Sequence, residues 1–152
     1  MKLTLKMKVF EEAYSHTRRK EIMRDIIKNI HLSEYKNKTF EEIIAKVSIN
    51  YGHINGIGPL ALYDITSGIC KHHTINIDRV YIIGPGPIRA IKLLKVKTIK
   101  QKFAHSTIAY SEIGDIIRAF DVHKVELSVE MRHSKNGDEF ESFLCRWQKT
   151  IK

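Results

Sequence analysis

Residues 54–69 read INGIGPLALYDITSGI, and this stretch decides how we expect the chain to fold. Gly56 and Gly58 permit backbone angles that other residues disfavour, and they let another group approach the chain closely. Ile57, between them, is expected to point inward. Pro59 is a favoured first residue of a helix. The stretch therefore predicts a tight turn that leads directly into a helix.

A second helix is expected just before this turn. Thr39 is a good N-cap, and Glu42 follows three residues later, as in a capping box. Apolar side chains then recur at helical spacing to about Tyr51, where Gly52 can end the helix. We expect a hairpin element over about residues 43–94, which also includes a second glycine turn.

The remaining segments give mixed signals. Helical spacing predicts further helices over residues 8–30 (with a polar interruption at 15–20), 84–94, 110–120, 122–132 and 138–151, the last with Asp138 as its N-cap. Residues 75–83 alternate like a short strand, but no neighbouring segment supplies a partner strand. Residues 95–107 are basic and irregular, with a short helix expected over 97–104. The fold class that follows is all-α: a small helical bundle in a single domain over residues 1–152.

Composition places the chain among ordinary globular domains. It has 152 residues, of which 43% are hydrophobic and 28% charged. No stretch approaches the roughly 18 consecutive apolar residues of a membrane helix, and the N-terminus lacks the apolar core of a secretory signal. The two cysteines, Cys70 and Cys145, form no CxxC pair. We therefore expect a cytoplasmic protein with no membrane partner, no metal site and no cofactor.

Charge is the most informative property. The formal net charge is +9, and no carboxylate stands between Asp78 and Glu112. We call this interval the basic window; it holds Arg79, Arg89, Lys92, Lys95, Lys97, Lys100 and Lys102, followed by His105. An unopposed basic run is typical of a protein that binds a polyanion, most often nucleic acid. The alternative is a solvated face in a lysine-rich chain.

The glycine turn resembles the hairpin of the helix-hairpin-helix family. That hairpin has an apolar residue, a spacer and a Gly-hydrophobic-Gly triplet, with a small residue three positions later; Ile54, Gly56–Gly58 and Ala61 match it. The resemblance implies that the amides of this triplet face a phosphate oxygen, helped by the positive end of the next helix. Such contacts position a protein on DNA without reading its sequence.

A second turn, Gly84-Pro85-Gly86-Pro87, has similar spacing and a weaker fit. Pro85 replaces the inward apolar residue and lacks the amide that a phosphate would use. Arg89 and Lys92 follow on the expected helix. The turn is either a second, degenerate hairpin or a plain connection between two helices.

Enzymatic activity is a separate question. In helix-hairpin-helix DNA glycosylases a catalytic Asp follows the first hairpin glycine by a little over twenty residues, and Asp78 stands 22 residues after Gly56. Leu60 occupies the position where bifunctional members carry their lysine nucleophile, so an enzyme of this kind would be a monofunctional glycosylase. Only 53 residues precede the hairpin, which is short for the helical domain that shapes the base pocket in that family. Asp78 is therefore only a weak catalytic candidate, and our preferred interpretation makes it an N-cap for the segment that follows.

A broader resemblance covers residues 54–145. Gly56–Gly58 with Tyr63-Asp64, Val80-Tyr81 before a glycine turn, and EFESFLC at 139–145 resemble a family of small bacterial proteins of unassigned function. This resemblance implies one fold for the whole chain and no particular activity. The chain departs from that family at Gly84–Pro87, where the family carries Ala-Gly-Thr-Arg.

These observations favour non-enzymatic, largely sequence-independent binding of nucleic acid, with duplex DNA as the expected partner. The candidate contact residues are Gly56, Ile57, Gly58, Arg79, Gly84, Gly86, Arg89, Lys92, Lys95 and Lys97. The first alternative is a protein-interaction module, such as a phage or mobile-element accessory factor. The second alternative is a glycosylase-like enzyme.

Overall fold

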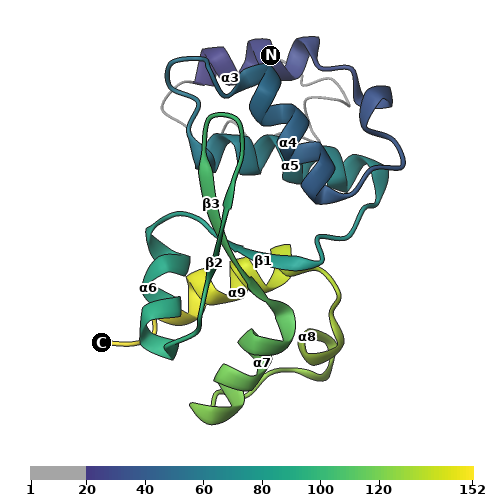
Figure 1. Ribbon diagram of the computed structural model, residues 1–152. Helices are drawn as coiled ribbons and strands as arrows, with labels where there is room; N and C mark the ends of the chain where they lie inside the picture. The colour runs from purple at the N-terminus through teal and green to yellow at the C-terminus, as the bar shows by residue number, and fades with distance from the viewer. Residues whose placement is uncertain (1–19) are drawn as a thin grey trace. The chain divides into compact units, whose positions relative to one another are not determined.

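The structure is a computed structural model that describes residues 20–152 (Figure 1). Helices make up most of this part of the chain, and three short strands form an antiparallel sheet. The all-α expectation is therefore wrong in this respect, and the fold is α/β with a helical majority. The beginning of the helix predicted over residues 8–30 lies outside the described residues.

The described chain divides into two compact units. Unit 1 runs to Ile75 and also takes in the short segment Phe103–Ser106, whereas unit 2 consists of Asn76–Lys102 and Thr107–Lys152. The predicted hairpin element, residues 43–94, therefore contributes to both units. Each unit is described separately below.

Unit 1 is helical. Its elements are α3 (Lys20–Asn29), the 3₁₀ helix η1 (Leu32–Tyr35), α4 (Phe40–Tyr51) and α5 (Pro59–His73). The predicted capping box at the start of α4 is confirmed: the Glu42 amide donates to Thr39 Oγ1, and the Thr39 amide donates to Glu42 Oε1, both at 3.1 Å. Helices α4 and α5 pack together through side chains that are almost fully buried, among them Phe40, Ile43, Ile44, Val47, Leu62 and Ile65.

Unit 2 contains the sheet. Its elements are β1 (Arg79–Ile82), α6 (Pro85–Leu94), β2 (Ile99–Lys102), β3 (Thr107–Glu112), α7 (Ile113–Val122), α8 (Val129–His133) and α9 (Gly137–Gln148). The strand order is β1-β3-β2, so β3 is central. Both neighbours pair with it in antiparallel fashion, with Tyr81 and Ile99 each opposite Tyr110.

The sheet explains where the secondary-structure prediction was wrong. The strand signal at 75–83 was genuine, but its partner β3 comes about 25 residues later in the sequence. Tyr110 was expected to begin a helix but lies in that strand. The helix, α7, begins directly after β3 ends. The helix expected over 97–104 is absent from the described chain, since residues 99–102 form β2. Within 122–132, Val122 ends α7 and residues 129–132 form most of the short helix α8.

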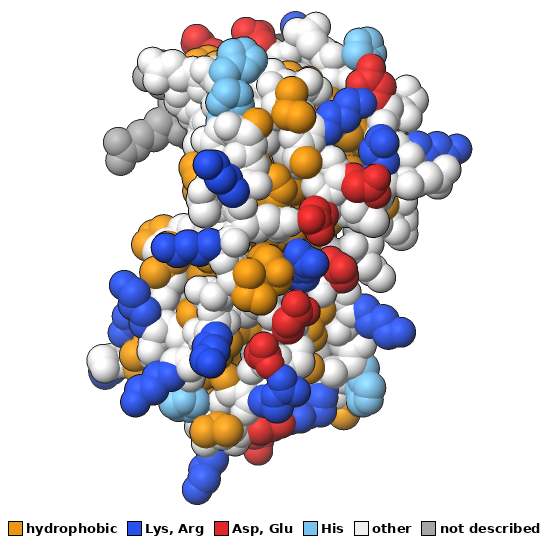
Figure 2. Space-filling model, viewed as in Figure 1, with side chains coloured by type: hydrophobic (Ala, Val, Ile, Leu, Met, Phe, Trp, Pro, Cys, Tyr) orange, Lys and Arg blue, Asp and Glu red, His pale blue; other side chains and the backbone are white. Residues whose placement is uncertain are grey.

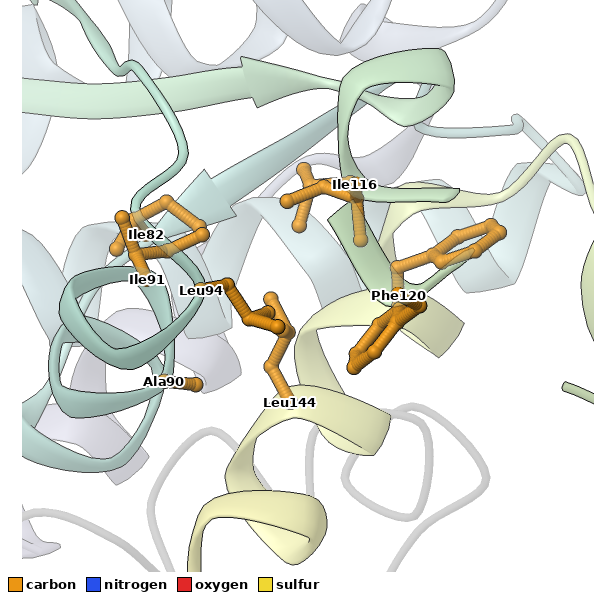
Figure 3. Close-up of a cluster of buried hydrophobic side chains, with 9 residues drawn as sticks. Ile82, Ala90, Ile91, Leu94, Ile116, Phe120 and Leu144 are labelled. Carbon is orange, nitrogen blue, oxygen red and sulfur yellow. The ribbon is translucent and has the colours of Figure 1, made fainter. Parts of the chain in front are cut away.

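The core of unit 2 lies between the sheet and its helices. Figure 3 shows side chains from β1, α6, α7 and α9 converging, among them Ile82, Ala90, Ile91, Leu94, Ile116, Phe120 and Leu144. Trp147 packs edge-on against Phe120, with ring centroids 5.5 Å apart. Helix α9 begins where Gly137 lies directly against the backbone of β1, and its N-cap is Asn136, not the predicted Asp138. Among residues 20–152, no helix has the length and apolar character needed to cross a membrane.

Candidate nucleic-acid interface

The first glycine turn has the local geometry that the sequence predicts. The Ile57 amide donates to the Ile54 carbonyl at 3.0 Å, which closes a β-turn with Asn55 and Gly56 at its centre. Gly56 has φ 97°, a value that favours glycine, and Ile57 is buried. Gly58 then accepts from the Leu62 amide at 3.0 Å and begins α5 as its N-cap. The tight turn and the inward position of Ile57 are confirmed.

The N-terminus of α5 differs from that of α4. Helix α4 has a side-chain cap and two glutamates in its first turn, whereas α5 has neither a side-chain cap nor an acidic residue there. The amides of a first helical turn have no acceptor inside their own helix. Since Pro59 has no N–H, the amides at this end of α5 are those of Leu60 and Ala61. Leu60 is 40% exposed, so this positive helix end lies at the surface of unit 1.

Gly58 is not required by the backbone. Its φ is −102°, an angle open to any residue, and a Cβ built there would meet no atom within 4 Å. Only Gly56 is held in the left-handed region at this turn. A small side chain at position 58 would therefore project into open space beside the first amides of α5.

The second glycine turn is neither a second hairpin nor a connection between two helices, the two alternatives that the sequence left open. It joins strand β1 to helix α6, with Gly84 as the N-cap at φ 84°. Pro85 and Pro87 remove two of the first-turn amides. A Cβ on Gly86 would lie 2.7 Å from Cys145 Sγ, so this glycine permits close packing of α6 against α9. The structure thus gives Gly86 a packing role, and the turn offers fewer amides than the first one.

The basic window presents its lysines to solvent. Lys92 and Lys95 lie on and just after the end of α6, Lys97 follows them, and Lys100 and Lys102 lie on β2. All five side chains are exposed, and none forms an ion pair with any residue of the described chain. Figure 2 shows Lys and Arg side chains gathered over the side of unit 2 on which α6 and the C-terminus lie. Lys100 and Lys102 were left out of the predicted contact set, although their position in the basic window could have included them.

The two arginines of the window are used differently. The Arg89 guanidinium donates to the Gln148 carbonyl, to Gln148 Oε1 at 2.9 Å and to the Ile151 carbonyl at 3.0 Å. It therefore ties α6 to the end of α9. Arg79 lies over the Tyr110 ring, 4.3 Å from its centroid, in a cation–π contact. The lysines, rather than the arginines, make up the available charge.

Two further residues named in the sequence analysis, Asp78 and Tyr63, have other surroundings than those expected of site residues. Asp78 is an exposed residue immediately before β1, so its interpretation as a helix N-cap is wrong, and it belongs to a different unit from Gly56. Tyr63 is a core residue, buried against Phe40 with ring centroids 5.7 Å apart. Within residues 20–152, no three His, Cys, Asp or Glu side chains are grouped so that they could hold one metal ion.

Comparisons with known proteins provide no relative from which the role of these residues could be inferred. No protein family, no curated protein and no solved structure was found to match the chain.

Proposed function

We propose that this protein is a non-enzymatic nucleic-acid-binding protein that contacts the phosphate backbone of duplex DNA with little dependence on sequence. Lys92, Lys95, Lys97, Lys100 and Lys102 supply the charge. The amides at the start of α5 supply a separate contact in unit 1. Asp78, an exposed carboxylate, receives no catalytic role.

The lysines of the basic window carry this proposal. They are five exposed ammonium groups within eleven residues, in an interval of the sequence that holds no carboxylate. Within the described chain they form no ion pair. A phosphate backbone provides the missing negative charge and releases its condensed counterions when it is bound. Lysines on an edge strand such as β2 also discourage strand pairing, so charge alone does not distinguish the two roles.

The first glycine turn supports the same function independently. Two packed helices, a turn with positive φ at Gly56, a buried Ile57 and an uncapped α5 N-terminus together resemble a helix-hairpin-helix element. A helix N-terminus without its own cap or acidic side chain favours an anion. We assign one phosphate to the Leu60 and Ala61 amides.

The aromatic residues favour duplex over single-stranded nucleic acid. Proteins that bind single strands stack bases on exposed aromatic rings. Among residues 20–152, every Phe, Tyr and Trp is buried or half-buried. The described surface therefore offers charge without a stacking platform, which suits the regular backbone of a duplex.

The test is a salt titration of binding to matched duplex and single-stranded DNA. For the wild type we expect tighter duplex binding and a log–log slope of about −0.9 for each phosphate contacted. The triple variant Lys92→Ala, Lys95→Ala, Lys97→Ala should reduce the steepness of that slope by up to about 2.7, which is three such contacts.

A matched control removes the same charge elsewhere: Lys36→Ala, Lys124→Ala, Lys135→Ala. All three control lysines are exposed, and Lys124 has a left-handed φ of 58°, as Lys95 has at 56°. The control should lose much less of the slope. Equal losses in the two triple variants would mean that only net charge matters, and no duplex binding by the wild type at low salt would end the proposal.

A protein partner is the second candidate. Val122 and Val129, at the end of α7 and the start of α8, are 77% and 71% exposed. Apolar patches on a surface mark contacts with other proteins, and these two valines would belong to such a patch under this second candidate. Substituting both valines with Ser should leave DNA binding unchanged under our proposal.

A further inference from the structure

We propose that His53 and His105 form a two-histidine binding site in unit 1 for a divalent transition-metal ion such as Zn²⁺. His53 follows α4 in the first glycine turn, and His105 lies in the short segment between β2 and β3. The two imidazole rings lie near each other, with centroids 6.1 Å apart and planes inclined by 59°. Both side chains are exposed, so an ion can reach them from solvent.

The separation of the rings suits a shared ion. A zinc–nitrogen bond is about 2.0–2.1 Å long. Two imidazoles that bind one ion through a ring nitrogen each therefore have centroids roughly 5–6 Å apart, depending on the angle at the metal. At 6.1 Å, the centroids of His53 and His105 lie just beyond this range before any ion is bound. For one ion to bind to both residues, rotation about their side-chain bonds must bring one nitrogen of each ring to bonding distance.

Backbone contacts hold the two histidines in place. The His105 amide donates to Ser48 Oγ at 3.3 Å, and the Phe103 amide donates to the Ser106 carbonyl at 2.7 Å, which closes the turn around His105. Gly52 lies so close to this turn that a Cβ there would come within 2.9 Å of His105 Cβ.

His53 is fixed in the same way on its side. The amide of Gly52, just before it, donates to the Ser48 carbonyl at 2.9 Å, and the amide of Ile54, just after it, donates to the Tyr51 carbonyl at 3.1 Å. Ser48 therefore supports both chain segments. The ligand positions are set by the fold, so binding requires ordering only of the two side chains.

The chemistry of imidazole selects the class of ion. Neutral imidazole binds Zn²⁺, Ni²⁺ and Cu²⁺ well, whereas Mg²⁺ and Ca²⁺ prefer oxygen ligands. Since the described chain brings no third His, Cys, Asp or Glu to the pair, water or an external donor completes the coordination. The affinity should accordingly be lower than that of a four-ligand structural site.

A second histidine pair provides a control. His72 and His73 are neighbours at the end of α5 with ring centroids 4.8 Å apart, but their side chains leave the helix in different directions. His73 Nε2 lies 2.6 Å from the Leu32 carbonyl, so one ring nitrogen is already engaged. We expect this pair to contribute little to metal binding.

The experiment is a calorimetric titration of the full chain with Zn²⁺ at neutral pH. We expect one site per chain that weakens at least tenfold in both His53→Asn and His105→Asn and remains unchanged in His72→Asn. Circular dichroism of the metal-free variants checks their folding, and both substitutions fall on exposed side chains.

A second measurement uses the wild type alone. Zn²⁺ should protect His53 and His105 from chemical modification by diethyl pyrocarbonate more strongly than His72, as mapped by mass spectrometry. Absence of Zn²⁺ binding, unchanged binding in both His53→Asn and His105→Asn, or protection of His72 rather than of this pair would overturn the proposal. These readouts do not involve nucleic acid, so they are independent of the proposed DNA binding.

Discussion

The two units differ in how they could meet a polyanion. The described part of unit 1 carries seven Lys/Arg and six Asp/Glu, a net charge of +1, together with the open N-terminus of α5. Unit 2 carries fourteen Lys/Arg and nine Asp/Glu, a net charge of +5. In its glycine turn, however, two prolines lack an amide N–H, and Gly86 packs against α9. One unit therefore offers directed backbone amides with little charge, and the other offers charge with few amides.

This difference changes how the candidate site should be tested. The ten candidate contact residues all fall between positions 56 and 97 of the sequence. The structure divides that set between two units. Each contribution therefore needs its own variant, and each variant needs its own control.

The largest effect is expected from Gly137→Ala in unit 2. The new Cβ would overlap the carbonyl group of Arg79, and backbone cannot move away as a flexible side chain can. We expect unit 2 to lose on the order of 3 kcal/mol or more of unfolding free energy. Urea unfolding followed by fluorescence measures this, because Trp147 is the single tryptophan of the chain and lies in unit 2.

Gly114→Ala is the control in the same unit. Gly114 is exposed in the first turn of α7, and a Cβ there would make only an ordinary 3.5 Å contact with Arg118. Alanine is the better helix former, so stability should stay constant or rise by up to about 1 kcal/mol. If the Gly137→Ala variant were as stable as the Gly114→Ala variant, Gly137 could not lie as close to the backbone of β1 as described.

Features set by neighbouring residues could be predicted from the sequence. The capping box of α4 needs only Thr39 and Glu42, three positions apart, and the turn needs only Gly56 and the inward-pointing Ile57. These were predicted correctly. In both cases the residues that determine the structure lie within one turn of each other.

Features set by distant residues were missed. Strand β1 depends on β3, and Gly86 depends on Cys145, which is 59 positions further along the chain. As a basic residue in the basic window, Arg89 was a candidate phosphate ligand. Only the hydrogen bonds that its guanidinium donates to Gln148 and Ile151 show its structural role. The sequence thus indicated the charge of unit 2 correctly but could not say which basic side chains were already engaged.

An intermediate effect is expected from Arg89→Ala. It removes three hydrogen bonds to the end of α9, so we expect unit 2 to lose roughly 1–2 kcal/mol of unfolding free energy. Because this guanidinium is engaged within the protein, the salt dependence of DNA binding should hardly change. Lys92→Ala, on the same helix, should show the opposite pattern: unchanged stability and a slope less steep by about 0.9. A loss of slope in Arg89→Ala with no loss of stability would return Arg89 to the set of phosphate ligands.

The smallest effect on stability, and the most direct test of unit 1, is expected from Gly58→Ser. Serine is a better N-cap than glycine by a few tenths of a kcal/mol, and its side chain has open space here. Its hydroxyl oxygen would accept from the Leu60 or Ala61 amide, the groups that we assign to a phosphate. Duplex affinity should therefore fall while the salt slope changes little, because the slope follows the phosphates neutralised by Lys or Arg and this change alters no charge. The unfolding free energy of unit 1 should stay constant or rise slightly. Gly58→Ala is the matched control, because it adds the Cβ without the hydroxyl and should weaken the cap instead.

A fall in affinity for the Ser variant alone indicates that the amides are the binding groups, and a fall for both variants indicates that the DNA approaches this backbone closely. If both variants bind like the wild type, the glycine turn only joins two helices, and the lysines of unit 2 account for the binding by themselves.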